Sequence, residues 1–543
     1  MLVLGIGGFY HDYNCALIDV ENKQVAMIEA ERISRRKHHV IRPGEDLLAP
    51  IERCCNDLGV SIKNIDTVVF GHTDPFPVKE KLQTSLGRRK KYVSVDHHLA
   101  HAAAAFFSSQ FEDASIVSLD GYGDGSSALL AAGQGNKIEE LTRTDDQNSF
   151  GLEYLRATIH LGLGGHGEEG KTQGLAAYGE PTYYEAYMEQ IDVDGDGRIH
   201  LGPALQGDIT HLSREGGYLN TELLTNSFLN DLFPRRISPE PLDTIHKNLA
   251  ASVQKVLDEI GTKLGLIVKQ KTGKTNLVLG GGVSMNSTMN GVLLLGSQFA
   301  GLYALPMASD RGIGLGAALY HIHQELNVPR FFYLDQVFYG GAYKDKDAER
   351  AMKEAGLRTH KSDDVKHEVA QALNNELIVG WFQGRSEMGA RALGHRSILA
   401  NPGRAEMKNI INERVKHREW FRPFAPSVME EFAEDYFAFP ANVADLTFMT
   451  FTVPATPRGE REIPATVHVD KTSRVQLVSE TTNPEYHAVI NAFRDLSGLP
   501  VVLNTSFNDK GEPIVETPEN AVRTFLNTDM DMLCIGNMIG LKK

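Results

Sequence analysis

The hydrophobic pattern at the start of the chain predicts short strands separated by glycine turns. Residues 2–6 form an apolar run that ends at Gly7-Gly8, and the runs 13–20 and 23–30 follow as two further strands. The same order returns at residues 115–132, where an apolar run, an Asp-Gly-Tyr-Gly-Asp-Gly turn and a second apolar run follow one another. This repetition predicts two similar halves.

Two later segments each place glycines where a helix begins. Residues 276–286 form an apolar strand that breaks into the turn Gly280-Gly281-Gly282 and then an apparent helix. Residues 308–317 provide a second glycine-rich helix start, with the Asp310 carboxylate just ahead of it. Such turns can lie flat against a nucleotide or a phosphate.

The periodicity changes after Tyr320, and residues 327–341 are predicted to be a connector. We therefore place a domain boundary near residue 345. The C-terminal part mixes a helix at residues 364–375 with strands such as 501–503, so the whole chain is predicted to be of the α/β class.

The composition is that of a soluble globular protein. A chain of 543 residues with 42% hydrophobic and 23% charged residues should form roughly two to four domains. The net charge of -15 argues against general nucleic-acid binding. The start of the chain has no signal-peptide pattern, and no run reaches ~18 uninterrupted apolar residues, so a cytoplasmic location without membrane contact is predicted. The four cysteines form no Cys-x-x-Cys pair and are predicted to be reduced and mostly buried.

The run 384–397 interrupts this acidic background. It contains Arg385, Arg391 and Arg396, and residues 384–422 hold nine Lys/Arg against four Glu, a local charge of +5. Guanidinium groups match phosphate oxygens, and glycines let backbone N–H groups approach the same oxygens. The alternative is an ordinary solvated basic patch. An apolar strand just before the run favours a site for a phosphate-rich small molecule.

A pair of histidines predicts a metal site. His97 and His101 lie one turn apart at the start of an alanine-rich helix, so both imidazoles face the same side. Asp120 and Asp310, each at a glycine turn, would complete a shell of nitrogen and oxygen ligands that suits Fe, Mn or Zn. By contrast, residues 192–199 imitate half of a calcium loop but lack its final Glu, and they are predicted to be a polar turn between strands.

Taken together, these features resemble the O-carbamoyltransferase family that includes the nodulation and antibiotic carbamoyltransferases. The resemblance covers essentially the whole chain. It is carried by the following motifs: a His-Asp after the first strand, His-His-x-x-His, Asp-Gly-x-Gly-Asp-Gly, Gly-Lys-x-x-Gly-Leu-Ala-x-Tyr-Gly, Gly-Gly-Gly-Val and Gly-Arg-x-Glu. The sequence departs from the family pattern at Ala390 and His395, which affects the expected shape of that loop.

The resemblance implies a fold of two parts. Residues 1–345 would form a duplicated, actin-like domain of the ASKHA class and TsaD type that performs carbamoyl transfer. Residues 346–543 would form a YrdC-like α/β domain that makes carbamoyl-adenylate.

The resemblance also implies roles for individual residues. His97, His101, Asp120 and Asp310 resemble the family's iron-type site, and His11 falls at its proposed general base, with Asp12 the next candidate. The residues implied to contact the nucleotide or carbamoyl-adenylate are Lys171, Gly280, Gly281, Gly282 and Asn286. Those implied or predicted to bind carbamoyl phosphate and ATP are Arg385, Arg391, Arg396, Lys416, Arg418, Arg422, Arg474 and Asn504.

The implied reaction is an ATP-dependent O-carbamoylation. Carbamoyl phosphate is consumed at the C-terminal domain, the resulting carbamate attacks ATP, and carbamoyl-adenylate then passes its carbamoyl group to a hydroxyl of a small natural product of the sugar, aminoglycoside or macrolide type. The implied cofactors are Fe2+, or Mn2+ or Zn2+, in the N-terminal domain and Mg2+ with ATP. The acceptor would be selected by loops such as residues 207–223, and a homodimer is the oligomer considered.

Two alternatives share parts of this pattern. An actin-fold small-molecule kinase would leave the histidine pair and the basic C-terminal part unexplained. A threonylcarbamoyl-adenosine-type tRNA modification enzyme is disfavoured by the acidic charge, because a tRNA substrate needs an extended basic surface.

Overall fold

The computed structural model describes residues 1–42, 44–207, 224–296, 299–440 and 443–543. Contacts divide the chain into two compact units: unit 1 comprises Met1–Ser34, His38–Leu334 and Ala441–Ala444, and unit 2 comprises Arg35–Lys37, Asp335–Pro440 and Asp445–Lys543. The assignment of functional domains to residues 1–345 and 346–543 stays a prediction. Residues 208–223 of the predicted acceptor loop lie outside the described residues.

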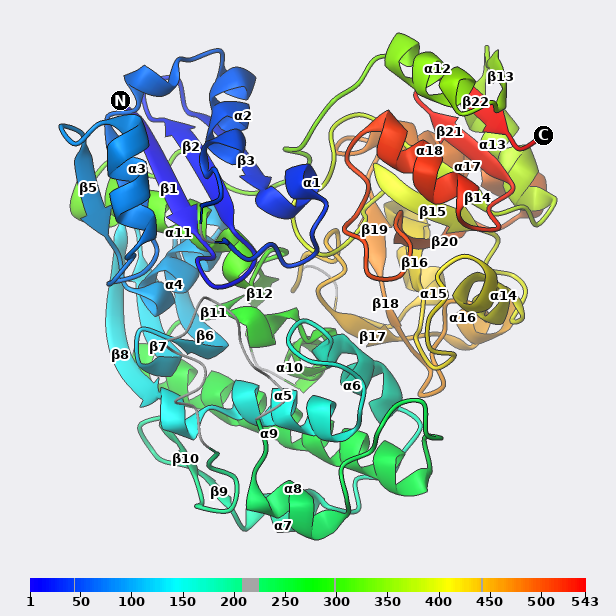
Figure 1. Cartoon of the computed structure of the whole chain (residues 1–543). Coiled ribbons are helices and arrows are strands. Elements are labelled where there is room, and N and C mark those ends of the chain that lie inside the picture. The colour runs from blue at the N-terminus through cyan, green and yellow to red at the C-terminus, as the bar shows by residue number, and fades with distance from the viewer. Residues whose placement is uncertain (43, 208–223, 297–298, 441–442) are drawn as a thin grey trace. The chain divides into compact units, whose positions relative to one another are not determined.

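Unit 1 is built on two five-stranded sheets with the same strand order (Figure 1). In the first, β3-β2-β1-β4-β5, the neighbours β1, β2 and β3 are antiparallel, whereas β4 and β5 run parallel to β1. The second, β8-β7-β6-β11-β12, repeats this order and these directions. The predicted duplication is therefore confirmed. The strands are β1 Leu2–Gly7, β2 Asn14–Asp19, β3 Gln24–Glu29, β4 Thr67–Phe70, β5 Lys91–Ser94, β6 Asp113–Gly123, β7 Ser126–Gln134, β8 Lys137–Asp145, β11 Asn276–Gly280 and β12 Gly301–Ala304.

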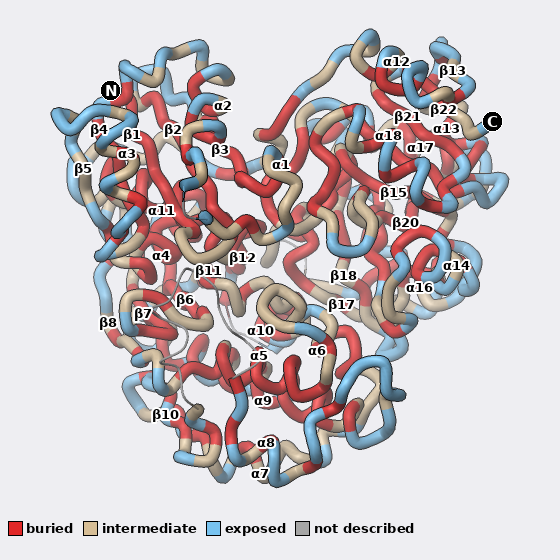
Figure 2. Tube along the Cα trace, in the orientation of Figure 1, coloured by how far each residue is buried: buried red, intermediate tan, exposed pale blue. Residues whose placement is uncertain are grey.

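The central strands of both sheets are buried along most of their length (Figure 2), which explains why they appear in the sequence as continuous apolar runs. Helices follow the strands: α1 Ala30–Ser34, α2 Leu48–Leu58, α3 Val78–Leu86, α4 His97–Ser108, α5 Phe150–His160, α6 Glu169–Ala176, α7 Tyr184–Met188, α8 Ser227–Leu232, α9 Thr244–Thr272, α10 Ser287–Gly296 and α11 Ile313–Leu319. The 3-10 turns η5 Gly282–Met285 and η6 Asp310–Gly312 precede α10 and α11.

The segment that imitates a calcium loop is a hairpin turn. It joins β9 Ile191–Val193 to β10 Ile199–Leu201, and the Asp194 carboxylate accepts hydrogen bonds from the backbone N–H groups of Asp196 and Arg198. The prediction of a polar turn between strands is confirmed.

Helix α11 packs unusually close to both β1 and α4. A Cβ added at Gly5 of β1 would lie 1.8 Å from the Gly314 carbonyl oxygen, and one added at Gly316 would lie 1.9 Å from the Ala100 carbonyl oxygen. Both approaches are possible only because these residues have no side chain. The alternating glycines of the segment Gly312–Gly316 thus set α11 between the first sheet and α4.

Unit 2 contains an eight-stranded mixed sheet of order β13-β22-β21-β14-β15-β20-β16-β19 (Figure 1). Its strands are β13 Arg358–Lys361, β14 Val379–Phe382, β15 Arg396–Ala400, β16 Ala425–Met429, β19 Gln476–Val478, β20 Val501–Ser506, β21 Met532–Ile535 and β22 Met538–Leu541, with a separate pair β17 Thr452–Pro454 and β18 Thr472–Arg474. The helices are α12 Asp345–Glu354, α13 Val365–Asn374, α14 Met407–Arg414, α15 Ala433–Tyr436, α16 Pro457–Glu462, α17 Pro484–Ser497 and α18 Pro518–Leu526. The mixed α/β class is confirmed, and the YrdC-like assignment of this unit stays a prediction.

Two predictions about the chain as a whole, on its cysteines and on membrane-spanning segments, can be compared with the structure. All four cysteines are free and buried, as predicted. In the part of the chain that the structure describes, no helix combines the length and apolarity needed to cross a bilayer.

The close packing of α11 predicts a reversal of the usual effect of alanine in a helix. We expect Gly316→Ala to lower the free energy of unfolding by roughly 1–3 kcal/mol, because the new Cβ collides with backbone. Gly170→Ala in α6 is the matched control: an added Cβ there meets nothing within 4 Å, so we expect a gain of about 0.5–1 kcal/mol. Urea unfolding of the two variants measures both values, and a stabilised Gly316→Ala protein would contradict the packing.

Candidate functional site

Four side chains from three separated elements converge in unit 1. His97 and His101 come from the first turns of α4, Asp120 from β6 and Asp310 from the first residue of η6. The His97 Nε2 atom lies 3.0 Å from Asp120 Oδ2 and 3.1 Å from His101 Nε2. The His101 Nε2 atom lies 3.4 Å from Asp120 Oδ2 and 3.6 Å from Asp310 Oδ1. One ligand atom of each residue lies within 4.8 Å of the others, so these residues could hold a metal ion, and the sequence had predicted the same four.

The charges of this group favour a bound cation. Burial opposes the charge on His101, but Asp120 and Asp310 outweigh it and raise the pKa of the imidazole to about 9. Burial likewise acts against ionised Asp120, yet His101 and His97 hold the pKa of its carboxyl well below the usual range. Two buried carboxylates beside two imidazole nitrogens form a donor set that suits a divalent metal ion, which would replace the protons.

Backbone groups fix the ligands in place. The Asp120 Oδ1 atom accepts a hydrogen bond of 2.8 Å from the Gly282 N–H, and Asp124 accepts one of 2.8 Å from the His97 N–H. A Cβ at Gly281 would lie 2.1 Å from the Leu119 carbonyl oxygen, and one at Gly280 would lie 2.9 Å from the His101 carbonyl oxygen. The glycine turn is thus required for packing around the ligands, and its predicted contact with a nucleotide stays a prediction.

His11 lies beside this group. Its Nε2 atom is 3.7 Å from Asp310 Oδ2, and its Nδ1 atom is 3.3 Å from Asp12 Oδ2. Burial opposes the charge on His11, but Asp310 and Asp12 raise the pKa of the imidazole to about 9. A cation bound to Asp310 would offset part of that attraction and lower the pKa towards the range of a general base.

A buried ionic network holds Asp12. The carboxylate lies 3.1 Å from Arg311 Nη2 and 3.0 Å from His38 Nδ1, and the residue has a φ of 57°. Arg311 is itself 3.3 Å from both Glu29 and Glu31. Sequence reasoning missed these partners, although an arginine directly after a predicted metal ligand was a signal available in the sequence.

Asn14 connects the His11–Asp12 turn to the segment that carries Asp310. Its Nδ2 group donates to the Asp12 carbonyl at 2.8 Å and to the Asp310 carbonyl at 2.6 Å, while its Oδ1 atom accepts from the Gly314 N–H at 3.0 Å. An asparagine at the start of an apolar strand was the sequence signal for this role, and the structure shows it buried.

The loop between α5 and α6 brings a further imidazole to His11. The ring of His166 lies 4.0 Å from the His11 ring, centroid to centroid, and 6.0 Å from the His38 ring. Burial, and after it the charge of His11, lower the pKa of His166. This histidine was not among the predicted site residues.

Lys171 and Asn286 have structural partners. The Lys171 ammonium donates to the Leu163 carbonyl at 2.8 Å and lies 3.1 Å from Glu168. The Asn286 Oδ1 atom accepts from the N–H groups of Thr288 and Met289 at the start of α10. These contacts fix the loop and the helix end, and the predicted nucleotide contacts of both residues stay predictions.

Unit 2 gathers four cations that its carboxylates do not balance. Burial, and then Arg418 and Arg422, hold the pKa of Lys416 well below its usual range. Burial and the same two arginines lower the pKa of Arg474 to about 10. Glu419 and Asp509 are the carboxylates that oppose this repulsion. We call Lys416, Arg418, Arg422 and Arg474 the cation cluster.

The Lys416 ammonium is already surrounded by oxygens. It donates to the carbonyls of Ser506 at 2.8 Å and Asn508 at 2.6 Å, and to Asn508 Oδ1 at 2.6 Å. Arg474 differs, because its Nε atom is buried without a hydrogen-bond partner among the described residues. A buried cationic donor of this kind is suited to an anionic ligand.

The guanidinium of Arg396 in the arginine run is held by groups of the protein itself. Arg396 is fully buried, its Nη atoms donate to the carbonyls of Gln383 and Gly341, and its guanidinium stacks 3.5 Å from the Phe382 ring centre. Because these donors are committed to the protein itself, we leave Arg396 out of the proposed phosphate ligands. Arg385 donates to the Tyr339 carbonyl at 2.6 Å, and Arg391 is half-buried on the same loop.

A buried carboxylate organises this loop. One oxygen of Glu387 accepts hydrogen bonds from the backbone N–H groups of Leu393, His395 and Arg396 at 2.8–3.1 Å. The glycines and glutamate of the run therefore shape the loop, which the count of charges could not show.

Asn504 is buried beside the cluster of polar groups on β16 and β19. Its Nδ2 group donates to the Ala392 carbonyl, Ser427 Oγ and Gln476 Oε1 at 3.0–3.1 Å, and its Oδ1 atom has no hydrogen-bond partner among the described residues. That oxygen remains available to a ligand, so its predicted role stays a prediction.

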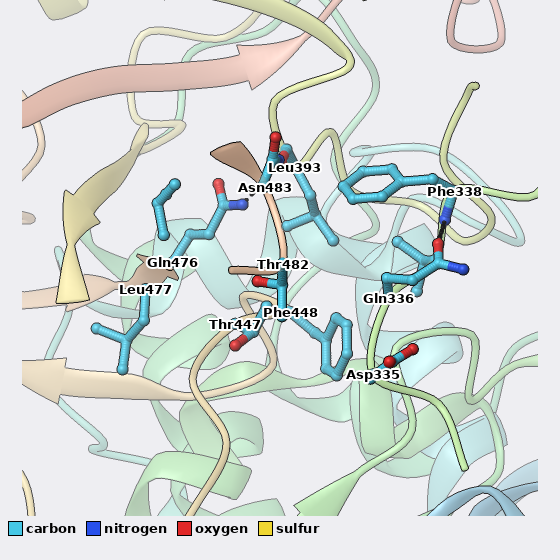
Figure 3. Close-up of a pocket in the computed structure, with 12 residues that line it drawn as sticks. Asp335, Gln336, Phe338, Leu393, Thr447, Phe448, Gln476, Leu477, Thr482 and Asn483 are labelled. Atoms are coloured by element: carbon cyan, nitrogen blue, oxygen red, sulfur yellow. Dashed lines mark hydrogen bonds between the residues drawn. The ribbon is translucent and has the colours of Figure 1, made fainter. Parts of the chain in front are cut away.

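Unit 2 also contains a small pocket that is partly open to solvent (Figure 3). Phe338, Leu393 and Phe448 supply apolar walls, and Thr482 and Asn483 supply polar groups. Gln336 accepts a hydrogen bond from the Phe338 N–H at its rim. Its lining, as far as the structure describes it, includes none of the predicted site residues.

Comparisons with solved structures give only weak likenesses. HypF from T. kodakarensis is 13% identical, with a TM-score of 0.33 over 59% of this chain and 47% of that one. A ROK family glucokinase from Streptomyces griseus is 11% identical, with a TM-score of 0.29 over 59% of this chain and 98% of that one. Likenesses at this level carry no argument about the function.

Comparisons of sequence are decisive. Nodulation protein NolNO of Sinorhizobium fredii is 35% identical over 98% of this chain and 79% of the relative, and nodulation protein NolO of Bradyrhizobium diazoefficiens is 39% identical over 83% of this chain and 79% of the relative. Residues 2–94 and 77–319 match the family model for the carbamoyltransferase N-terminus, and residues 370–542 match that for the carbamoyltransferase C-terminus. The chain therefore belongs to the carbamoyltransferase family.

Proposed function

We propose that this carbamoyltransferase makes carbamoyl-adenylate from carbamoyl phosphate and ATP and transfers the carbamoyl group to a hydroxyl of a small natural product. The observation that carries the proposal is the cation cluster. Burial, and then the neighbouring arginines, lower the pKa of Lys416, Arg418 and Arg474, so a bound anion would stabilise the charged cluster, and the two substrates bring several phosphates.

In the proposed first stage, carbamoyl phosphate is hydrolysed to carbamate and phosphate in unit 2. A carbamate oxygen then attacks the α-phosphorus of ATP, and the bond to pyrophosphate breaks. Arg422 and Arg474 would bind the phosphate oxygens, with Mg2+ bound to the nucleotide sharing the charge. Lys416 would add its positive charge beside them, because its three N–H donors are taken by Ser506 and Asn508. Arg418 has fewer donors left for phosphate, because its Nε group donates a hydrogen bond of 2.7 Å to Asn412 Oδ1.

In the proposed second stage, the acceptor hydroxyl attacks the carbamoyl carbon of the adenylate in unit 1. The carbon–oxygen bond to phosphate breaks, and AMP leaves. His11 would accept the hydroxyl proton, and Asp12 would orient the imidazole through the contact at 3.3 Å. His97, His101, Asp120 and Asp310 would hold a divalent cation, Fe2+ in preference to Mn2+ or Zn2+, which would supply Lewis-acid stabilisation of the negative charge on the leaving group.

A direct experiment tests the overall proposal. The protein is incubated with carbamoyl phosphate, ATP and Mg2+ together with glucosamine, kanamycin or erythromycin, which represent the sugar, aminoglycoside and macrolide classes. Mass spectrometry should find one carbamoyl group added to an acceptor and one AMP released per transfer. ADP formation in place of AMP would favour a kinase instead.

The predictions of a cytoplasmic location, of a homodimer and of no nucleic-acid partner are kept as part of this proposal. Filter binding to tRNA would separate it from the tRNA-modification alternative.

Loss of a metal ligand should stop carbamoyl transfer and leave carbamoyl-adenylate formation intact. We expect His101→Ala to lower the metal content by at least tenfold and to abolish carbamoyl transfer, because one imidazole is removed from a four-ligand group. Exchange between ATP and pyrophosphate should continue, since that chemistry is assigned to unit 2. His200→Ala is the control: His200 is exposed on the β9–β10 hairpin and bonded to Asp194. Full metal occupancy in His101→Ala would remove it from the ligands.

The cation cluster should control the first stage. We expect Arg422→Ala to reduce ATP–pyrophosphate exchange by a factor of at least ~30, because loss of a charged partner in an enclosed site costs roughly 2–5 kcal/mol. Arg458→Ala, an exposed arginine paired with Asp435 and Glu462, serves as the control and should exchange normally. Equal exchange rates in the two variants would exclude Arg422 from the site.

His11 should affect only the second stage. We expect His11→Ala to form carbamoyl-adenylate at the normal rate and to transfer its carbamoyl group about 10² to 10⁴ times more slowly, which is the usual contribution of one proton-transfer group. The variant should retain its metal, because His11 is not counted among the ligands. Transfer at nearly the wild-type rate would move the role of base to another residue, with Asp12 the first candidate.

A further inference from the structure

The loop that carries His166 is shaped to hold one imidazole against another. Gly162, Gly164 and Gly167 adopt positive φ values of 61°, 128° and 85°. A Cβ added at Gly167 would lie 2.3 Å from His38 Nε2, so the loop rests directly on the histidine that pairs with Asp12. A loop of this shape is constrained at both ends, and the position of His166 is set by the backbone.

The ring of His166 is held by ring contact rather than by hydrogen bonds. Its centroid lies 4.0 Å from that of His11, with an angle of 45° between the planes. Neither ring nitrogen of His166 forms a hydrogen bond with any residue that the structure describes, and the side chain is half-buried. An imidazole has one donor and one acceptor nitrogen in its neutral form. Both are therefore left for a ligand at a site where His11 faces Asp310.

Two side-by-side imidazoles suit an acceptor with two neighbouring hydroxyls. The hydroxyl that attacks the carbamoyl carbon would give its proton to His11, and the second hydroxyl, on the adjacent carbon, would lie within reach of the ring nitrogens of His166. A single alcohol would satisfy only the first imidazole and would leave His166 without a partner. The arrangement thus selects for vicinal diols, the functional group of sugars and cyclitols.

We propose that His166 is an acceptor-binding residue that makes this enzyme prefer vicinal diols over isolated alcohols. The inference rests on the proposed transfer reaction and adds the acceptor class to it. The transfer itself is unchanged: the diol oxygen forms the bond to the carbamoyl carbon, AMP departs, and His166 contributes a hydrogen bond to the oxygen that does not react.

A pair of minimal acceptors tests the proposal. The wild-type protein is assayed with trans-1,2-cyclohexanediol and with cyclohexanol, which differ only in the second hydroxyl. One additional hydrogen bond to the acceptor predicts a preference of about fivefold to tenfold in kcat/KM for the diol. His166→Phe keeps a ring that can pack against His11 but removes both nitrogens, and it should lose this preference through a higher KM for the diol. His166→Asn should recover part of it.

Two further measurements and a control variant distinguish a specific role of His166 from a general loss of structure. Metal content and ATP–pyrophosphate exchange should be unchanged in His166→Phe, which shows that the fold and the first stage are intact. His200→Phe is the matched control, since His200 is exposed on the β9–β10 hairpin and bonded to Asp194.

An undiminished diol preference in His166→Phe would overturn the assignment, as would a wild-type protein that does not distinguish the two alcohols. A wild-type protein that carbamoylates no acceptor at all would overturn the proposed function itself.

Discussion

The close approach of α11 to β1 and α4 is the constraint on which the candidate centre depends. Gly5 and Gly316 allow backbone-to-backbone packing that any side chain would block, and this packing brings Asp310, just before α11, against His101 of α4. Asn14 then fixes the same segment to the His11–Asp12 turn through three hydrogen bonds. A movement of α11 would therefore shift Asp310 relative to His101 and to His11 at the same time.

Once these groups are together, their charges determine what the centre can do. Asp120 and Asp310 are buried close to one another, and without a cation they must be balanced by protons on the imidazoles, which is why the pKa of His101 and that of His11 both rise to about 9. A divalent metal ion would replace those protons and lower the charge on His11 in the same step. The metal centre and the candidate base are thus coupled through Asp310, which contacts both.

The sequence predicted the parts of this molecule that depend on local periodicity. The i, i+4 spacing of His97 and His101 indicated a shared ion, and the repeated strand-turn-strand order indicated a duplicated sheet, because both patterns are visible within a single element or turn. The arginine run was interpreted from its charge, and charge alone cannot tell a ligand-binding guanidinium from one that binds backbone carbonyls. Arg396 belongs to the second kind, and the deciding carbonyls of Gly341 and Gln383 are supplied by tertiary structure. His166 was missed for a related reason, since a histidine in a glycine-rich loop carries no periodic signal until the loop is folded.

The two candidate sites have opposite electrostatic character, and each charge suits one half of the chemistry. In unit 2, bound phosphates would relieve the repulsion between the cations, so the proposed substrates of adenylate formation would stabilise the site that binds them. In unit 1, the carboxylates would bind a cation, and under the proposed reaction a neutral acceptor would be recognised by hydrogen bonds. Hydrogen bonds discriminate by position rather than by charge, because a buried donor or acceptor left without its partner costs free energy. The choice of acceptor would therefore fall to uncharged polar groups beside the candidate metal centre, and the proposed role of His166 follows from ring nitrogens that form no hydrogen bond with a described residue.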